Sequence, residues 1–140
     1  MTTEKIYKIE TTLDDESPQV IGYVLERALE LGALDAYTVA AQMKKNRPGV
    51  LLTLLARAAE REVLVRLLLT ETTTLGVRVE PSVRVVLKRK MRTIETEYGA
   101  IRVKVAAGKS MPEYEDCRAA ARRAGVPLRM VLKSISLASK

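Results

Sequence analysis

The 140-residue chain contains no histidine, tryptophan or phenylalanine, and its one cysteine is Cys117. Without histidine, it can supply neither Ser-His nor Cys-His catalysis, and no imidazole ligand for a metal. A single cysteine excludes an internal disulfide, fits a reducing compartment and leaves too few ligands for structural zinc. Any metal bound by these side chains is therefore expected to be a hard cation with oxygen ligands, such as Mg²⁺ or Mn²⁺.

The sequence also lacks a long apolar run. No stretch approaches the roughly 20 apolar residues of a membrane span, and the first residues, MTTEKIYKIE, lack the apolar segment of a secretory signal. Apolar residues nevertheless make up 47% of the chain, which excludes a disordered protein. We therefore expect a cytoplasmic, globular protein with no membrane segment.

Positive charge is concentrated in the second half of the chain. Residues 1–70 carry 9 Lys and Arg against 10 Asp and Glu, whereas residues 71–140 carry 15 against 7. This asymmetry indicates an anionic partner, although a merely solubilising surface is the alternative. Nucleic acid is not the expected partner, because five tyrosines are the only aromatic residues available for base stacking.

Hydrophobic periodicity and turn residues predict the order β-α-β-β-α-β, followed by a hairpin and two helices. Ser17 and Pro18 are typical of a helix start, Gly32 of a helix end, and Pro81 of an edge strand. The expected strands are Lys5–Leu13, Leu34–Met43, Val50–Leu55 and Gly76–Val86. The two main helices are expected to run from Pro18 to Gly32 and from Ala58 to Leu69. The hairpin joins Thr93–Glu97 to Ile101–Val105, and the last two helices cover Glu113–Ala124 and Pro127–Ala138.

This order is the signature of the ferredoxin-like α+β sandwich. We expect residues 1–108 to form that domain with its added hairpin, and residues 109–140 to form a helical appendage. Right-handed crossovers make the first and second strands parallel, and the third and fourth run in the opposite direction. The end of the first strand, the loop between the second and third strands, and the start of the fourth strand therefore meet at one end of the sheet.

Each of these three places carries a polar segment. The first strand ends in two carboxylates, the loop carries three cations, and a threonine run precedes the fourth strand. Carboxylates suit Mg²⁺ or Mn²⁺, and Lys and Arg suit phosphate oxygens, so the sequence predicts one shared site for a metal-bound anion. Taken singly, the same segments have simpler readings: charges near a helix start, a solvated hairpin tip, and turn-forming threonines.

Two further groups have structural interpretations. Glu113, Glu115 and Asp116 fit the start of a helix better than a metal site, and Cys117 is expected to be a small buried apolar residue. The basic run Lys88-Arg89-Lys90, with Arg92, is typical of a solvated strand edge that resists aggregation.

Four segments together resemble the C-terminal domain of the LarC-type nickel insertion proteins. They are ETTLDD (Glu10–Asp15), QMKKNRPG (Gln42–Gly49), ETTTLGVR (Glu71–Arg78) and PEYEDC (Pro112–Cys117). Thr12 stands where members often have Asn, and Asn46 where Gly is usual. Members also have a longer N-terminal region with no counterpart here, so we expect this chain to be a fragment or one product of a split gene.

The resemblance implies a cytoplasmic lyase, a CTP-dependent nickel chelatase. It would insert Ni into pyridinium-3,5-bisthiocarboxylic acid mononucleotide, forming the nickel-pincer cofactor of lactate racemase-type enzymes, and would hydrolyse CTP with Mg²⁺ or Mn²⁺. For this domain we expect CTP binding, with no catalytic residue assigned. The expected metal ligands are Asp14 and Asp15, and the expected phosphate-binding residues are Lys44, Lys45, Arg47, Thr72, Thr73, Thr74 and Arg78.

Two alternatives come from other functional classes. The basic second half could bind nucleic acid, or the domain could serve only for oligomerisation, since ferredoxin-like sheets often pair through edges or faces. For the enzyme, we expect a homo-oligomer whose partners are CTP, the mononucleotide and the remaining N-terminal region.

Overall fold

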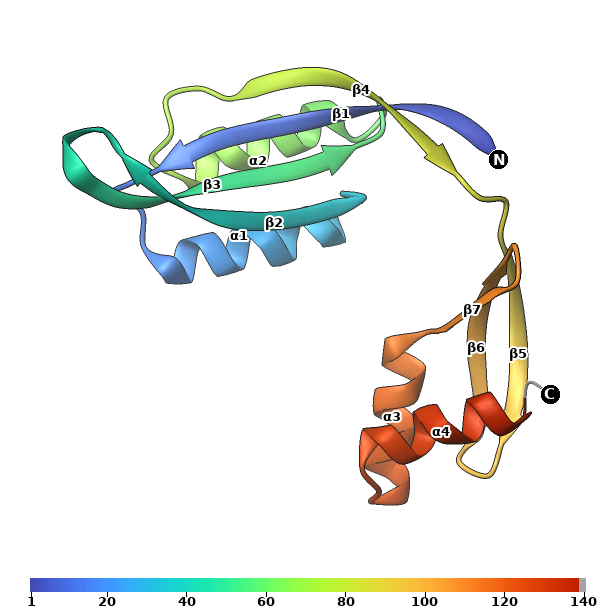
Figure 1. Ribbon diagram of the computed structural model, residues 1–140. Helices are drawn as coiled ribbons and strands as arrows, with labels where there is room; N and C mark the ends of the chain where they lie inside the picture. Colours follow the sequence, from blue (N-terminus) through green and yellow to red (C-terminus); the bar gives the residue numbers. More distant parts are fainter. Residues whose placement is uncertain (139–140) are drawn as a thin grey trace. The chain divides into compact units, whose positions relative to one another are not determined.

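The computed structural model describes residues 1–138, and side chains up to Ser136. The chain divides into two compact units, each with its own sheet and helices (Figure 1). We call residues 3–85 the N-terminal unit and the segment from Val86 onward the C-terminal unit.

The N-terminal unit has the predicted β-α-β-β-α-β order. Its elements are β1 (Thr2–Leu13), α1 (Pro18–Glu30), β2 (Asp35–Met43), a short 3₁₀ turn (Lys44–Asn46), β3 (Arg47–Ala56), α2 (Arg61–Glu71) and β4 (Arg78–Val86). The sheet order is β2-β3-β1-β4, and β3 runs antiparallel to both β1 and β2. This is the ferredoxin-like topology, so the expected α+β fold class is confirmed.

Local sequence signals set the helix and strand boundaries. The Ser17 side chain accepts a hydrogen bond from the Gln19 amide, and Pro18 occupies the first turn of α1, as predicted. Pro81 lies on β4, an edge strand, where a residue without a backbone N–H is tolerated.

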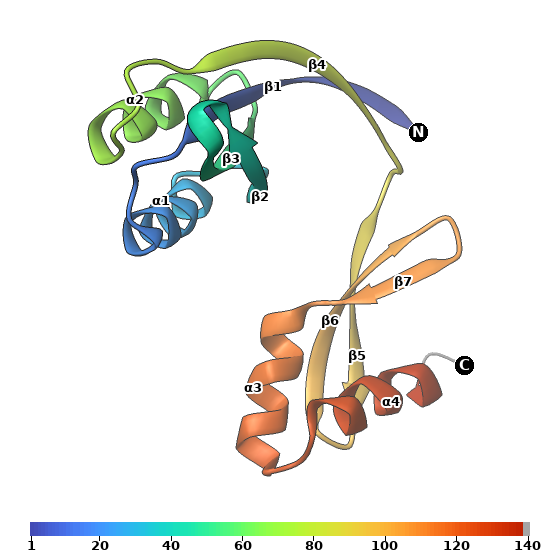
Figure 2. The ribbon, with the colours of Figure 1, turned by 60° about the vertical axis from the view of Figure 1, so that its left-hand side comes forward.

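Both helices cover the same face of the sheet (Figures 1 and 2). Alternate residues of β1 and β3, such as Ile9 and Leu54, pair across the strands and are fully buried. They pack with Val24 of α1 and Leu64 of α2 in one apolar core. The core fixes the register of the strands, because a slip by one residue would turn these side chains to the opposite face.

The C-terminal unit has its own antiparallel sheet and apolar core. Its elements are β5 (Lys90–Thr96), β6 (Gly99–Ala106), β7 (Lys109–Pro112), α3 (Tyr114–Ala124) and α4 (Leu128–Ala138), with sheet order β5-β6-β7. Ile101 and Val103 of β6 pack with Cys117 of α3 and Val131 of α4. Cys117 is 1% exposed, and burial raises the pKa of its thiol, so it is the apolar core residue that the sequence predicts.

Asp116 joins α3 to β6. Its carboxylate accepts hydrogen bonds from the Arg102 backbone amide at 2.9 Å and from the Arg102 guanidinium at 2.8 Å. The guanidinium and the amide lower the pKa of Asp116 to about 2. Glu113 pairs with Lys104, and Glu115 with Arg118, so these acids take part in structural contacts.

The region around residue 108 differs from the expectation. The helical appendage expected for residues 109–140 begins with a strand, because Lys109–Pro112 forms β7, which pairs with Val103–Ala106. The expected domain boundary at residue 108 also falls inside the C-terminal unit. The hairpin groups with the helices because the buried side chains of β6 pack against α3 and α4. Among the described residues, no helix is long and apolar enough to cross a membrane.

Candidate functional site

The three predicted polar segments lie at one end of the N-terminal sheet. We call residues 14–16, 44–47 and 71–76 the polar rim. The first and second segments meet where the Arg47 guanidinium lies 3.5 Å from an Asp14 carboxylate oxygen, although 33 residues separate them. The Asp14 side chain is 19% exposed, so its carboxylate is largely shielded by the surrounding chain.

The first and third segments are joined by two hydrogen bonds. The Thr73 hydroxyl donates to Asp15 at 2.7 Å, and the Thr73 backbone amide donates to Glu16 at 2.9 Å. These contacts connect residues 57 and 58 positions apart, as the crossover topology requires. Asp14, Asp15 and Glu16 thus each have a partner from another segment of the polar rim.

The other two threonines of the run have their hydroxyls engaged within the chain. The Thr72 hydroxyl donates to the Leu68 carbonyl at 2.7 Å, which caps the end of α2. The Thr74 hydroxyl lies 2.6 Å from that of the buried Thr11 and 2.8 Å from the Gly76 carbonyl. Thr72 and Thr74 thus hold the segment in place, and Thr73 is the member of the run that reaches the acids.

The loop between β2 and β3 has an unusual backbone conformation. Lys45 and Asn46 both have left-handed φ values, 60° and 57°. Gln42 donates a hydrogen bond to the Asn46 side chain at 3.0 Å, which supports this tight turn. Gly49 allows the loop to lie close to β1, since a Cβ at this position would be 2.5 Å from the Leu13 carbonyl oxygen.

Three of the cations predicted to bind phosphate have no side-chain partner in the described part of the chain. Lys44, Lys45 and Arg78 are exposed, and none has an ion pair or hydrogen bond there. Lys44 and Lys45 flank the tip of the loop, next to Arg47. The polar rim therefore combines internally paired carboxylates with cations that remain available to an anion.

The polar rim fits a hard divalent cation such as Mg²⁺ or Mn²⁺ better than a softer ion such as Ni²⁺, which prefers nitrogen or sulfur ligands. Asp14, Asp15 and Glu16 provide only oxygen donors, and no cluster of three or more potential ligands that could hold a metal ion occurs among the described residues. Mg²⁺ and Mn²⁺ sites on nucleotides need only one or two protein carboxylates, because phosphate oxygens and water complete the coordination. Two adjacent aspartates satisfy this requirement.

Two features of the molecule were missed from the sequence. Glu16, which is not among the predicted site residues, belongs to the polar rim, where its carboxylate accepts hydrogen bonds from the Ser17 and Thr73 backbone amides. In the C-terminal unit, Lys88, Arg89, Lys90 and Arg92 line a cavity, whereas the sequence predicts a solvated edge. Lys90 and Arg92 do lie on the edge strand β5, so the edge position and the cavity coexist.

A family model described as nickel insertion protein matches residues 1–132. The chain belongs to the nickel insertion protein family. It is 44% identical over 139 residues to the pyridinium-3,5-bisthiocarboxylic acid mononucleotide nickel insertion protein of Acetivibrio thermocellus, and the match covers 96% of this chain. It covers 34% of that relative, so the chain spans about a third of its length.

A solved structure also shares this fold. The apo C-terminal domain of a cyclometallase involved in the synthesis of the NPN cofactor of lactate racemase is 38% identical, with a TM-score of 0.91 and 99% of both chains covered. A Methanopyrus kandleri protein of 22% identity has a TM-score of 0.68 over 98% of this chain and 90% of its own, and shows the fold alone. The resemblance to this family and to its C-terminal domain is thereby confirmed.

Proposed function

We propose that this nickel insertion family chain is the nucleotide-binding part of a nickel-inserting enzyme, and that its polar rim binds CTP together with Mg²⁺ or Mn²⁺. The observation that carries the proposal is the meeting of the three segments, through the contacts Asp14–Arg47 and Asp15–Thr73. Carboxylates, cations and a hydroxyl come together there, as a metal-bound triphosphate requires.

Asp14 and Asp15 would hold the metal ion. When bound, the ion would neutralise phosphate charge and so favour hydrolysis of the triphosphate. Arg47 and Thr73 position the two carboxylates before the metal arrives, which lowers the reorganisation that binding requires.

Lys44, Lys45 and Arg47 would bind the phosphate oxygens, with Arg78 at the entrance to β4. The left-handed turn at Lys45 and Asn46 presents neighbouring cations at the loop tip. Arg47 begins β3, so its backbone is fixed by the sheet while its side chain reaches the rim. Thr72 and Thr74 contribute indirectly, by holding Thr73 in position.

Nickel would enter as a substrate, with its donors supplied from elsewhere. This sequence has no histidine, and the buried Cys117 thiol is 1% exposed with a raised pKa. Soft or imidazole donors for nickel would therefore come from the thiocarboxylates of the mononucleotide substrate or from another region of the longer protein. The name of the Acetivibrio relative supports this choice of substrate.

We also infer a cytoplasmic homo-oligomer formed through the open face of the N-terminal sheet. Tyr37 and Val39 lie on β2 opposite the helix-covered side, and are 41% and 51% exposed. Apolar side chains on an uncovered sheet face favour association with a second copy. Light scattering of Val39→Lys against the unsubstituted chain tests this inference, with a smaller particle expected for the variant.

Thermal unfolding in the presence of CTP and Mn²⁺ tests the nucleotide assignment. Ligand binding to the folded state alone stabilises it by about 2.7 kcal/mol at a hundredfold excess over the dissociation constant. We expect this stabilisation in the original chain and its loss in Asp14→Asn and Lys44→Gln. Glu62→Gln and Lys133→Gln are matched controls, because both side chains are exposed and lie outside the polar rim.

ATP and GTP, each with Mn²⁺, serve as competitors for base selectivity. The nucleotide assignment fails if CTP with Mn²⁺ gives no stabilisation, or if the rim variants respond like their controls. Salt-sensitive binding of oligonucleotides in place of CTP would favour the nucleic-acid alternative.

A further inference from the structure

The C-terminal unit contains a basic cavity that the nucleotide assignment does not use. Its volume is about 510 Å³, and it is lined by Lys88, Arg89, Lys90, Arg92, Val105, Ala106 and Ala107. We call these seven residues the basic groove. Two neighbouring cavities, of about 320 and 340 Å³, share Arg89 or Arg92 with it. Cavities of this size take small organic molecules.

The cations of the basic groove have no acidic partners in the described part of the chain. Elsewhere in the same unit, Arg102 pairs with Asp116, Lys104 with Glu113, and Arg118 with Glu115. None of the ion pairs or side-chain hydrogen bonds found there includes the four groove cations. The β6 cations Arg102 and Lys104 are thus neutralised by acids of the same unit, whereas the four groove cations are uncompensated among the described residues.

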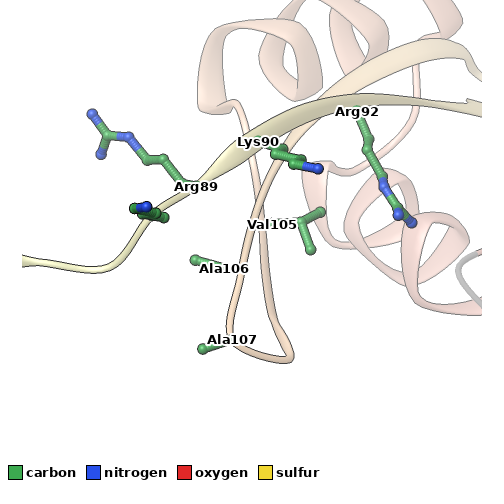
Figure 3. Close-up of a pocket in the computed structure, with 7 residues that line it drawn as sticks. Arg89, Lys90, Arg92, Val105, Ala106 and Ala107 are labelled. Atoms are coloured by element: carbon green, nitrogen blue, oxygen red, sulfur yellow. The ribbon is translucent and has the colours of Figure 1, made fainter. Parts of the chain in front are cut away.

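Geometry places two of these cations on the same side of β5. Lys90 and Arg92 are two residues apart on a strand, which puts their side chains on one face at a spacing of roughly 7 Å. Figure 3 shows both on the side of Val105, whereas Arg89 projects the other way. Like charges this close repel each other, and an anion held between them would remove the repulsion.

The groove floor indicates a compact ligand. Val105, Ala106 and Ala107 are small, and the tight turn at Ala107 and Gly108, with φ values of 46° and 77°, ends the floor. No aromatic side chain lines the cavity, so it offers no platform for the stacked bases of single-stranded nucleic acid. Two cations over a short apolar floor match one phosphate group better than a polymer.

We infer that the basic groove binds the phosphate group of a mononucleotide, with Lys90 and Arg92 as its main contacts. The inference of a phosphate site depends only on the geometry and charge of the basic groove. The choice of a mononucleotide over free phosphate rests on the proposed function, since the substrate named for the Acetivibrio relative is a pyridinium mononucleotide. Arg92 supplies a planar guanidinium that can bind two phosphate oxygens, and Lys90 adds a point charge.

Two ligands that differ only in the phosphate test this inference. Nicotinic acid mononucleotide is a pyridinium carboxylic acid mononucleotide, and nicotinic acid riboside lacks its phosphate. We would titrate each, and inorganic phosphate, into the 140-residue chain without divalent metal, and follow the backbone amide resonances. We expect the mononucleotide to bind and to shift residues 88–92 and 105–107, with the riboside at least tenfold weaker.

Variants then assign the contacts. Arg92→Gln is expected to weaken mononucleotide binding about tenfold, and Lys90→Gln with Arg92→Gln about a hundredfold, as for lost charge-assisted hydrogen bonds. Arg129→Gln is the matched control, because Arg129 is an exposed cation of the same unit outside the groove. Its affinity for the mononucleotide should stay within twofold of the original.

Other results would overturn the inference. Equal affinity for the mononucleotide and the riboside would exclude a phosphate site. If Arg129→Gln lost as much affinity for the mononucleotide as Arg92→Gln, the effect would be one of net charge and not of a site. Inorganic phosphate binding as tightly as the mononucleotide would remove the mononucleotide from the proposal. Shifts confined to residues 14–16, 44–47 and 72–74 would move the anion to the polar rim. Tighter binding of single-stranded oligonucleotides would assign the groove to nucleic acid.

Discussion

The two units of the chain use charge in different ways. In the N-terminal unit, Asp14, Asp15 and Glu16 of the polar rim are held by partners from other segments, as in Asp14–Arg47 and Asp15–Thr73. In the C-terminal unit, the paired charges join β6 to α3 through Arg102 and Asp116. The groove cations of that unit stay unpaired among the described residues.

This difference indicates that the two groups of charges have different roles: the paired carboxylates are positioned by the protein, and the unpaired cations can bind a ligand. Carboxylates that are already hydrogen-bonded are fixed in place, which suits metal ligands whose geometry must be defined in advance. Cations without acidic partners keep their full charge for a ligand, which suits the capture of an anion. Under our two proposals, the polar rim would bind a metal-bound triphosphate and the basic groove a phosphate monoester.

The largest expected effect is that of Leu54→Ala. Leu54 is fully buried in the core of the N-terminal unit, and its truncation should cost about 2–5 kcal/mol. Amide hydrogen exchange should show lost protection in residues 3–85, with the C-terminal unit unchanged. Val103→Ala is the counterpart in the other core. Loss of protection in both units from either variant would contradict two separate cores.

Gly49→Ala should come next, because it disturbs the polar rim directly. The added Cβ would lie 2.5 Å from the Leu13 carbonyl oxygen and 2.6 Å from the Met43 sulfur. We expect a loss of about 1–3 kcal/mol in urea unfolding, together with weaker binding of CTP and Mn²⁺. Gly22→Ala is the control, since open space surrounds that helical position and substitution there should stabilise α1. Equal effects would contradict the close packing of the loop.

Asp116 makes the stability of the C-terminal unit sensitive to acid. Its pKa falls to about 2 in the folded chain, from roughly 3.9 when unfolded. Its contribution is therefore complete above about pH 4 and is lost as the pH falls toward 2. Unfolding midpoints measured between pH 2 and 5 should show this loss in the original chain and not in Asp116→Asn. Glu115→Gln, with its pair within α3, should retain the pH dependence.

The smallest expected effects are changes in stability on replacing one cation from each region. Arg47→Gln removes an exposed ion pair and should cost less than about 1 kcal/mol of stability. Arg92→Gln removes a cation that has no acidic partner among the described residues, so the stability should be unchanged or slightly higher. Urea unfolding of both variants measures the difference. A clear destabilisation by Arg92→Gln would show that the groove cations have a structural role.

Much of the fold could be predicted from the sequence, because its strong signals are local. The Ser17–Pro18 helix start, Pro81 on an edge strand and the alternating apolar residues each follow from short-range chemistry. β7 could not be predicted in this way, because Lys109–Pro112 has little strand character and becomes a strand only by pairing with β6. The grouping of the hairpin with α3 and α4 likewise depends on tertiary packing and not on a local pattern.

The meeting of the rim segments was also predictable, since crossover handedness decides which loops share an end of the sheet. Individual partners were not. The roles of Glu16 and Thr73 depend on side-chain geometry, and Thr72 and Thr74 turn inward to backbone carbonyls. The basic groove depends on β6 and its turn lying beside residues 88–92, which no local pattern reveals.

Paramagnetic broadening by Mn²⁺ tests the central proposal most directly. Substoichiometric Mn²⁺ added with CTP should broaden the amide resonances around Asp14, Asp15 and Thr73, and Asp14→Asn should abolish this broadening. Broadening centred away from the polar rim, or equal broadening in Asp14→Asn, would contradict the assignment of the metal-bound nucleotide to this end of the sheet.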